Sequence, residues 1–152
     1  MPRALIALPL TALMTLAAPA GADPQLDRME DLSERMNALI NAAAIAELPA
    51  LEGSLPAPDW DEPMRGAFAC VLDAYRAEIG RDGVDAMLDQ MDAALVDLTP
   101  EALMSGEMDA QMQLPEGLSE ARSVEIMNSC RVIELMMERM MNSDAMDVMR
   151  TQ

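Results

Sequence analysis

Histidine and lysine are absent from this sequence of 152 residues, and the aromatic side chains are limited to one tryptophan, one tyrosine and one phenylalanine. Without histidine or lysine, the chain lacks the side chains that most often act as a general base or form a Schiff base. Carboxylate pairs occur throughout a chain with 27 acidic residues, so their presence does not indicate a hydrolase site. We therefore expect a non-catalytic protein and not an enzyme.

Positive charge is also scarce. All ten basic residues are arginines, and against 27 acidic residues they leave a formal net charge of −17. A charge this negative repels nucleic acid and anionic membrane surfaces. We therefore expect no nucleic-acid partner, and the partner to be identified is a protein or an apolar ligand.

Long apolar runs are missing except at the N-terminus. Arg3 precedes an apolar run over residues 4–18, and a small-x-small motif ends at Ala22. This three-part pattern predicts a secretory signal peptide over residues 1–22 that is cleaved after Ala22. The alternative, a membrane anchor, is disfavoured because the run is short and Pro9 interrupts it. We expect a periplasmic protein, with secretion from the cell as the alternative, and no membrane span in the mature chain.

Cysteine occurs only twice, as Cys70 and Cys130. In an exported chain, two cysteines indicate one disulfide bond. The bond would close a loop of about 60 residues, and the chain-entropy model then gives a stabilisation of roughly 4 kcal/mol. Two free, reactive thiols are the alternative, but there is no CxxC spacing and no basic neighbour beyond Arg131 to favour it.

Strand-like alternation of apolar and polar residues is absent, and three- and four-residue spacings dominate. The sequence predicts an all-α fold, a small bundle of four to five helices forming a single domain over residues 23–152. The expected helices lie near residues 25–47, 62–79, 83–97 and 119–141, and a weaker helix near residues 100–111 packs across one end. Residues 49–61 form a proline-rich loop, and residues 142–152 form a frayed C-terminal turn.

All three aromatic residues and one cysteine fall within residues 59–80. On a helical wheel, the bulky side chains share one face, which we expect to fill the core. Small residues occupy a neighbouring face, and they would let the helix of Cys130 approach closely enough for a disulfide. The small face consists of Ala67, Cys70, Ala74 and Ala77. We therefore expect residues 59–80 to be a structural centre, with any functional site elsewhere, in the proline-rich loop or the methionine-rich regions.

Two predicted helices place charged residues along one face. In the helix expected over residues 119–141, Ile126, Cys130, Ile133, Met137, Met140 and Met141 share an inner arc, while Arg131, Glu134, Glu138 and Arg139 take the outer one. Asp82, Asp85, Asp89 and Asp92 line one side of an earlier helix. We interpret this acidic stripe as a solvated face and not as a cation site, since EF-hand spacing is absent.

Methionine is the conspicuous excess, with 17 residues. The densest cluster contains Met136, Met137, Met140 and Met141. Thioethers are soft ligands that can hold Cu(I), which makes these four residues the candidate metal ligands. Methionine is equally a good core filler, and an exposed methionine surface can repack around varied apolar partners. The sequence favours a periplasmic interaction or binding module without a cofactor, and a methionine-based Cu(I)-binding protein is the alternative.

Overall fold

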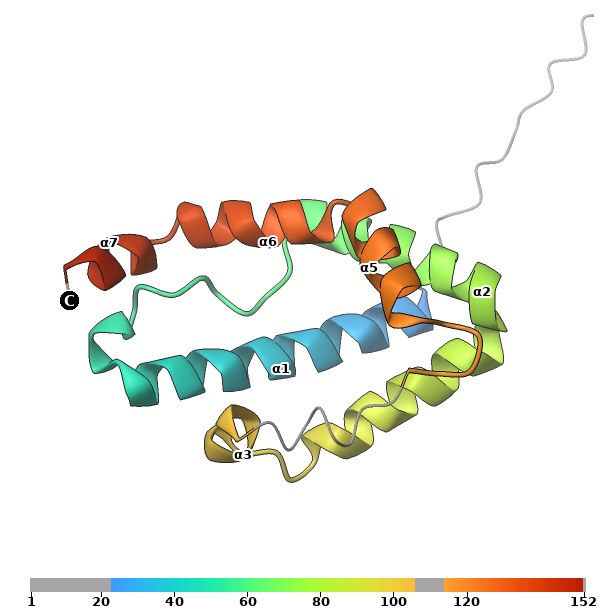
Figure 1. Cartoon of the computed structure of the whole chain (residues 1–152), viewed down its shortest axis with the longest axis horizontal. Helices are drawn as coiled ribbons and strands as arrows, with labels where there is room; N and C mark the ends of the chain where they lie inside the picture. Colours follow the sequence, from blue (N-terminus) through green and yellow to red (C-terminus); the bar gives the residue numbers. More distant parts are fainter. Residues whose placement is uncertain (1–22, 106–113, 152) are drawn as a thin grey trace, which may run out of the picture.

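The computed structural model describes residues 23–105 and 114–151, which contain six α-helices and no strand (Figure 1). The elements are α1 (Pro24–Glu47), the 3-10 helix η1 (Pro49–Leu51), α2 (Glu62–Leu95), α3 (Pro100–Met104), α5 (Glu120–Ser129), α6 (Val132–Met141) and α7 (Ala145–Arg150). The predicted all-α class is confirmed. The signal peptide predicted over residues 1–22 and much of the weak helix predicted near residues 100–111 lie outside the described residues.

Helix α1 begins directly after the predicted cleavage site. Asp23 is its N-cap, and the carboxylate accepts hydrogen bonds from the backbone N–H groups of Gln25 and Leu26. The same carboxylate pairs with the Arg76 guanidinium of α2 at 2.7 Å. The hydrogen bond from Arg76 is the main reason that the pKa of Asp23 lies below its ordinary value. One residue thus starts α1 and fastens it to α2.

Helix α2 changes direction at Gly80, which has φ 72° and ψ 172°. This backbone conformation lies outside the helical region and is favourable for glycine alone, because glycine has no Cβ. The sequence predicted that one helix would stop at Gly80 and another would follow. The non-helical backbone at Gly80 confirms this division, and α2 consists of two helical segments joined at a kink. Figure 1 shows the change of direction along α2.

The kink places α1 between the two halves of α2. Pairing with the first half is antiparallel, since Arg76 meets Asp23 and Arg65 contacts Asp27 further along α1. Pairing with the second half is parallel, because residues further along α1 contact residues further along α2. Gln25 contacts Asp85, and Arg35 contacts Asp92. The core between the three segments includes Leu32 from α1, Leu72 from the first half and Leu88 from the second, all essentially inaccessible to solvent.

The acidic stripe on the second half of α2 is more than a solvated face. Three of its carboxylates are bound by side chains of α1: Asp85 by Gln25 at 2.7 Å, Asp89 by Arg28 at 2.6 Å and Asp92 by Arg35 at 2.8 Å. Within residues 23–105 and 114–151, no group of His, Cys, Asp or Glu side chains is arranged to hold a metal ion. The stripe helps to set the register of α1 on α2.

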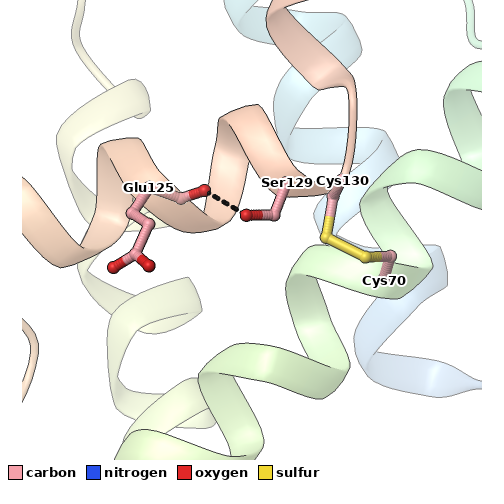
Figure 2. The surroundings of a disulfide bond; sticks show 4 residues. All are labelled: Cys70, Glu125, Ser129 and Cys130. Atoms are coloured by element: carbon pink, nitrogen blue, oxygen red, sulfur yellow. Dashed lines mark hydrogen bonds between the residues drawn. A yellow bond between two sulfur atoms is a disulfide. The ribbon is translucent and has the colours of Figure 1, made fainter.

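The predicted disulfide is present. Cys70 and Cys130 are bonded, with their Cα atoms 5.7 Å apart, within the range that a disulfide requires. Figure 2 shows the bond joining α2 to the end of α5, where the Ser129 hydroxyl donates to the Glu125 carbonyl oxygen at 2.8 Å. The sequence predicted Cys130 in the middle of a helix. In the structure it is the C-cap of α5.

The helix predicted over residues 119–141 is broken at Arg131, so this prediction was wrong in its continuity. Arg131 adopts a left-handed conformation with φ 63°, and α6 begins at the next residue. The break allows Cys130 to reach Cys70 while Val132 enters the core with no accessible surface. A continuous helix would hold Cys130 and Val132, two residues apart, about 160° apart around its axis, on nearly opposite faces.

The break also turns the remaining face of α6 away from its expected orientation. Met137 and Met141, predicted to face the core, are 57% and 70% exposed, and Ile133 is exposed as well. Conversely, Arg139 was expected on the outer arc, but its Nη2 atom donates to the backbone oxygens of Ala57 and Asp59 at 2.9 and 2.7 Å. Arg139 therefore attaches α6 to the proline-rich loop.

The end of the chain returns to the same loop. Ala145, at the start of α7, is fully buried, and its N–H donates to the Ser54 carbonyl oxygen at 3.1 Å. The segment expected as a frayed turn therefore contains a docked helix. Among the residues that the structure describes, none of the helices combines the length and hydropathy needed for a bilayer crossing.

The left-handed backbone at Arg131 predicts an unusual order of stability for two variants. Arg131→Gly and Arg131→Ala both lose the exposed ion pair with Glu134, so their difference isolates the backbone. Glycine accepts the left-handed conformation, and the Gly variant should be more stable than the Ala variant by about 1 kcal/mol. Denaturant unfolding of both variants measures this difference. In a continuous helix the order would reverse, with Ala favoured by about 1 kcal/mol.

Candidate functional site

An open cavity of about 360 Å³ lies where α1, the proline-rich loop and α6 meet. In Figure 1 the loop after η1 runs between α1 and α6, and α2 lies beside α6. We call this cavity the groove. It is lined by Ser33, Met36, Asn37, Ile40, Asn41, Pro56, Ala57, Trp60, Met64, Phe68, Met91, Met127, Met136, Arg139 and Met140.

One face of α1 forms a wall of the groove. Its five lining residues follow the i, i+3, i+4, i+7, i+8 spacing of a single helix face: Ser33, Met36, Asn37, Ile40 and Asn41. The first half of α1 buries its apolar face in the core, whereas this second half presents the continuation of that face to the groove. Ile40 is consequently exposed.

The loop forms the second wall and is held in place by polar contacts. The Asn41 side chain donates to the Pro56 carbonyl oxygen at 2.9 Å, and the backbone N–H of Trp60 donates to the Glu34 carboxylate at 3.0 Å. The Trp60 ring stacks on Phe68 of α2, with centroids 4.2 Å apart and planes 11° from parallel. The groove therefore has a rigid aromatic part whose loop side is anchored to α1.

Methionines supply most of the remaining surface. Six line the groove, contributed by four helices: Met36, Met64, Met91, Met127, Met136 and Met140. Met64 is buried and fixed, whereas Met136 and Met140 on α6 are exposed. Because methionine is unbranched and flexible, this side of the groove can adjust its shape to an apolar guest.

Charge is distributed unevenly around the groove. Within the described residues, no carboxylate lines it, although the chain carries 27 acidic residues. Its single charged lining residue is Arg139, which is half-buried and bonded to the two loop carbonyls. The cavity is thus an apolar surface with one cation in its wall.

The structure brings together only some of the residues singled out from the sequence. Of the four candidate Cu(I) ligands, Met136 and Met140 line the groove, whereas Met137 and Met141 are exposed on α6 and are not among its lining residues. Part of the expected structural centre also contributes, because Trp60 and Phe68 line the groove while Tyr75 is buried. The expectation that residues 59–80 would be separate from any site therefore does not fit this cavity.

Sequence reasoning missed the polar groove residues. Ser33, Asn37 and Asn41 recur at four-residue spacing beside the apolar face of α1, which was a detectable signal. Arg139 gave no such signal, because its orientation depends on the break at Arg131. Comparison of the chain with protein-family models, with curated proteins and with solved structures finds no match.

Proposed function

We propose that the protein is an exported, non-catalytic binding protein that holds an apolar ligand in the groove. The observation that carries this proposal is the lining itself, six methionines and a stacked Trp60–Phe68 pair around an open cavity of about 360 Å³. Ligand pockets are typically apolar cavities of about 300–1,000 Å³ with a few polar groups. Ser33, Asn37, Asn41 and Arg139 are the polar groups here.

The flexible methionine side of the groove supports a ligand-binding role over a purely structural one. Met136 is 47% exposed although it lies in an apolar environment. Covering apolar surface contributes roughly 25 cal/mol per Å² buried, so a guest that covered Met136 and Met140 would be stabilised by their removal from water. The rigid Trp60–Phe68 pair gives such a guest a fixed surface to pack against.

Binding of a neutral apolar dye, N-phenyl-1-naphthylamine, tests this proposal. We expect its fluorescence to increase on binding to the folded, oxidised protein. Met136→Glu should weaken binding at least about tenfold, because it places an unpaired carboxylate in an apolar cavity. Met137→Glu is the matched control, since it makes the same change on the same helix at a residue that is 57% exposed and outside the groove.

Two results would contradict the proposal. Background fluorescence with the wild-type protein would mean that the groove does not take an apolar guest. An equal loss of affinity in both variants would place binding on the outer surface of α6. Melting temperatures of the two variants provide the control for folding.

Export to the periplasm is part of the proposal. It is supported by the three-part pattern over residues 1–22 and by the Cys70–Cys130 bond, since structural disulfides form in oxidising compartments. N-terminal sequencing of protein recovered from a periplasmic fraction should begin at Asp23. A chain that still begins at Met1, found with the cytoplasmic fraction, would contradict export.

A methionine-based Cu(I) site is the second candidate function. It is favoured by the position of Met136 and Met140 in a groove that also holds Met36 and Met127, because soft thioether ligands select Cu(I). Met137 and Met141 complete the set of candidate ligands on α6.

Titration of Cu(I) against a competing chelator tests this second candidate. If the groove methionines bind the metal, Met136→Leu/Met140→Leu should abolish the competition, because leucine keeps the approximate volume and removes the sulfur. Met137→Leu/Met141→Leu is the matched control for the exposed pair. An affinity of the wild-type protein no greater than that of free methionine would rule out the site.

A further inference from the structure

Arg139 stands apart from most arginines of this protein. Seven others form ion pairs with aspartate or glutamate: Arg28, Arg35, Arg65, Arg76, Arg122, Arg131 and Arg150. Arg139 pairs with no described carboxylate, although the chain carries 27 acidic residues. Both of its hydrogen bonds to the loop come from Nη2, so Nε and Nη1 remain to act as donors toward a bound anion.

The position of the Arg139 guanidinium indicates which kind of ligand would bind to it. Arg139 lies in the wall of a groove that is otherwise neutral and largely apolar, within the described residues. Because Nη2 already donates to both loop carbonyls, a carboxylate would accept a single charged hydrogen bond from Nε or Nη1, which is stronger than a neutral one. The loop carbonyls of Ala57 and Asp59 fix its orientation in advance, so little side-chain freedom is lost when an anion binds.

We propose that the ligand is a medium- or long-chain fatty acid, with its alkyl chain in the groove and its carboxylate on Arg139. This inference rests on the proposed function and assigns the chemical class of the ligand. An alkyl chain makes no hydrogen bonds, which suits a lining of thioethers and stacked aromatic rings.

An apolar peptide with a free C-terminus shares the same carboxylate but fits less well. Each peptide unit brings an N–H and a C=O group that need partners when they are buried. The groove offers Ser33, Asn37 and Asn41 as its uncharged polar side chains, and Asn41 already donates to Pro56. The fatty acid needs one polar partner for its head group, and Arg139 provides it.

The decisive comparison uses dodecanoate and dodecanol, each below its micelle concentration, in displacement of the neutral dye at neutral pH. The two probes have the same chain length and differ in the charge of the head group. We expect dodecanoate to bind wild-type protein about tenfold more tightly than dodecanol, because a charged hydrogen bond is stronger than a neutral one. Dodecyltrimethylammonium, which carries the opposite charge, should displace the dye least.

Variants of two arginines assign this preference to a residue. Arg139→Gln should bring the ratio of dodecanoate to dodecanol affinity close to one. Arg150→Gln is the matched control, because it removes the same charge from an exposed arginine outside the groove and should keep the ratio. If Arg139→Gln binds neither probe, Arg139→Lys decides: a retained preference for dodecanoate supports the proposal, and equal binding overturns it.

The remaining outcomes separate the two proposals. Equal affinity of wild-type protein for dodecanoate and dodecanol, or a preference that survives in Arg139→Gln, overturns the fatty-acid assignment and leaves the apolar groove in place. Stronger displacement by an apolar tripeptide with a free C-terminus overturns it in favour of a peptide. Failure of the dye and of every probe to bind means that the proposed function itself is wrong.

Discussion

The Cys70–Cys130 bond, made at a break between two helices, is the constraint on which the groove depends. It fastens the end of α5 to α2, and the left-handed residue beside it, Arg131, lets α6 start again in a new orientation. In that orientation Val132 enters the core, and Met136, Arg139 and Met140 reach the groove. A covalent bond that closes a loop of about 60 residues contributes roughly 4 kcal/mol in the chain-entropy model, enough to hold such an arrangement.

The second organising feature is the placement of charge. Arginines of α1 pair with carboxylates in the second half of α2, and arginines in the first half of α2 pair with carboxylates at the start of α1, so the kink at Gly80 leaves ion pairs on both sides of α1. Most of these pairs are solvent-exposed, and such pairs typically contribute about 0–1 kcal/mol each. We infer that they set the register of the helices more than they stabilise the fold. In the described residues the same arrangement leaves the groove free of carboxylates, so that Arg139 is its one charged side chain.

Much of the fold could be predicted because it depends on local signals. In the structure, α2, α3 and α5 begin after capping side chains, Asp61, Thr99 and Ser119. Such caps, the stop at Gly80 and the pairing of two cysteines can be recognised from short-range patterns or simple counts. The orientation of α6 could not be predicted in this way. Residues 119–141 have a good helical pattern, and no glycine marks the left-handed position, which is occupied by Arg131. Once the break was missed, Ile133, Met137, Met141 and Arg139 were assigned to the wrong face, and the groove methionines could not be separated from the exposed ones.

The most direct measurement is dye binding to the protein without its disulfide, compared with the oxidised wild type. The Cys70→Ser/Cys130→Ser variant should keep its helical circular dichroism well below its melting temperature. It should lose most of its affinity for the neutral dye, because α6 is no longer fixed against the groove. Unchanged affinity in the variant would contradict the account, since it would show that the groove forms without the constraint that we place at its centre.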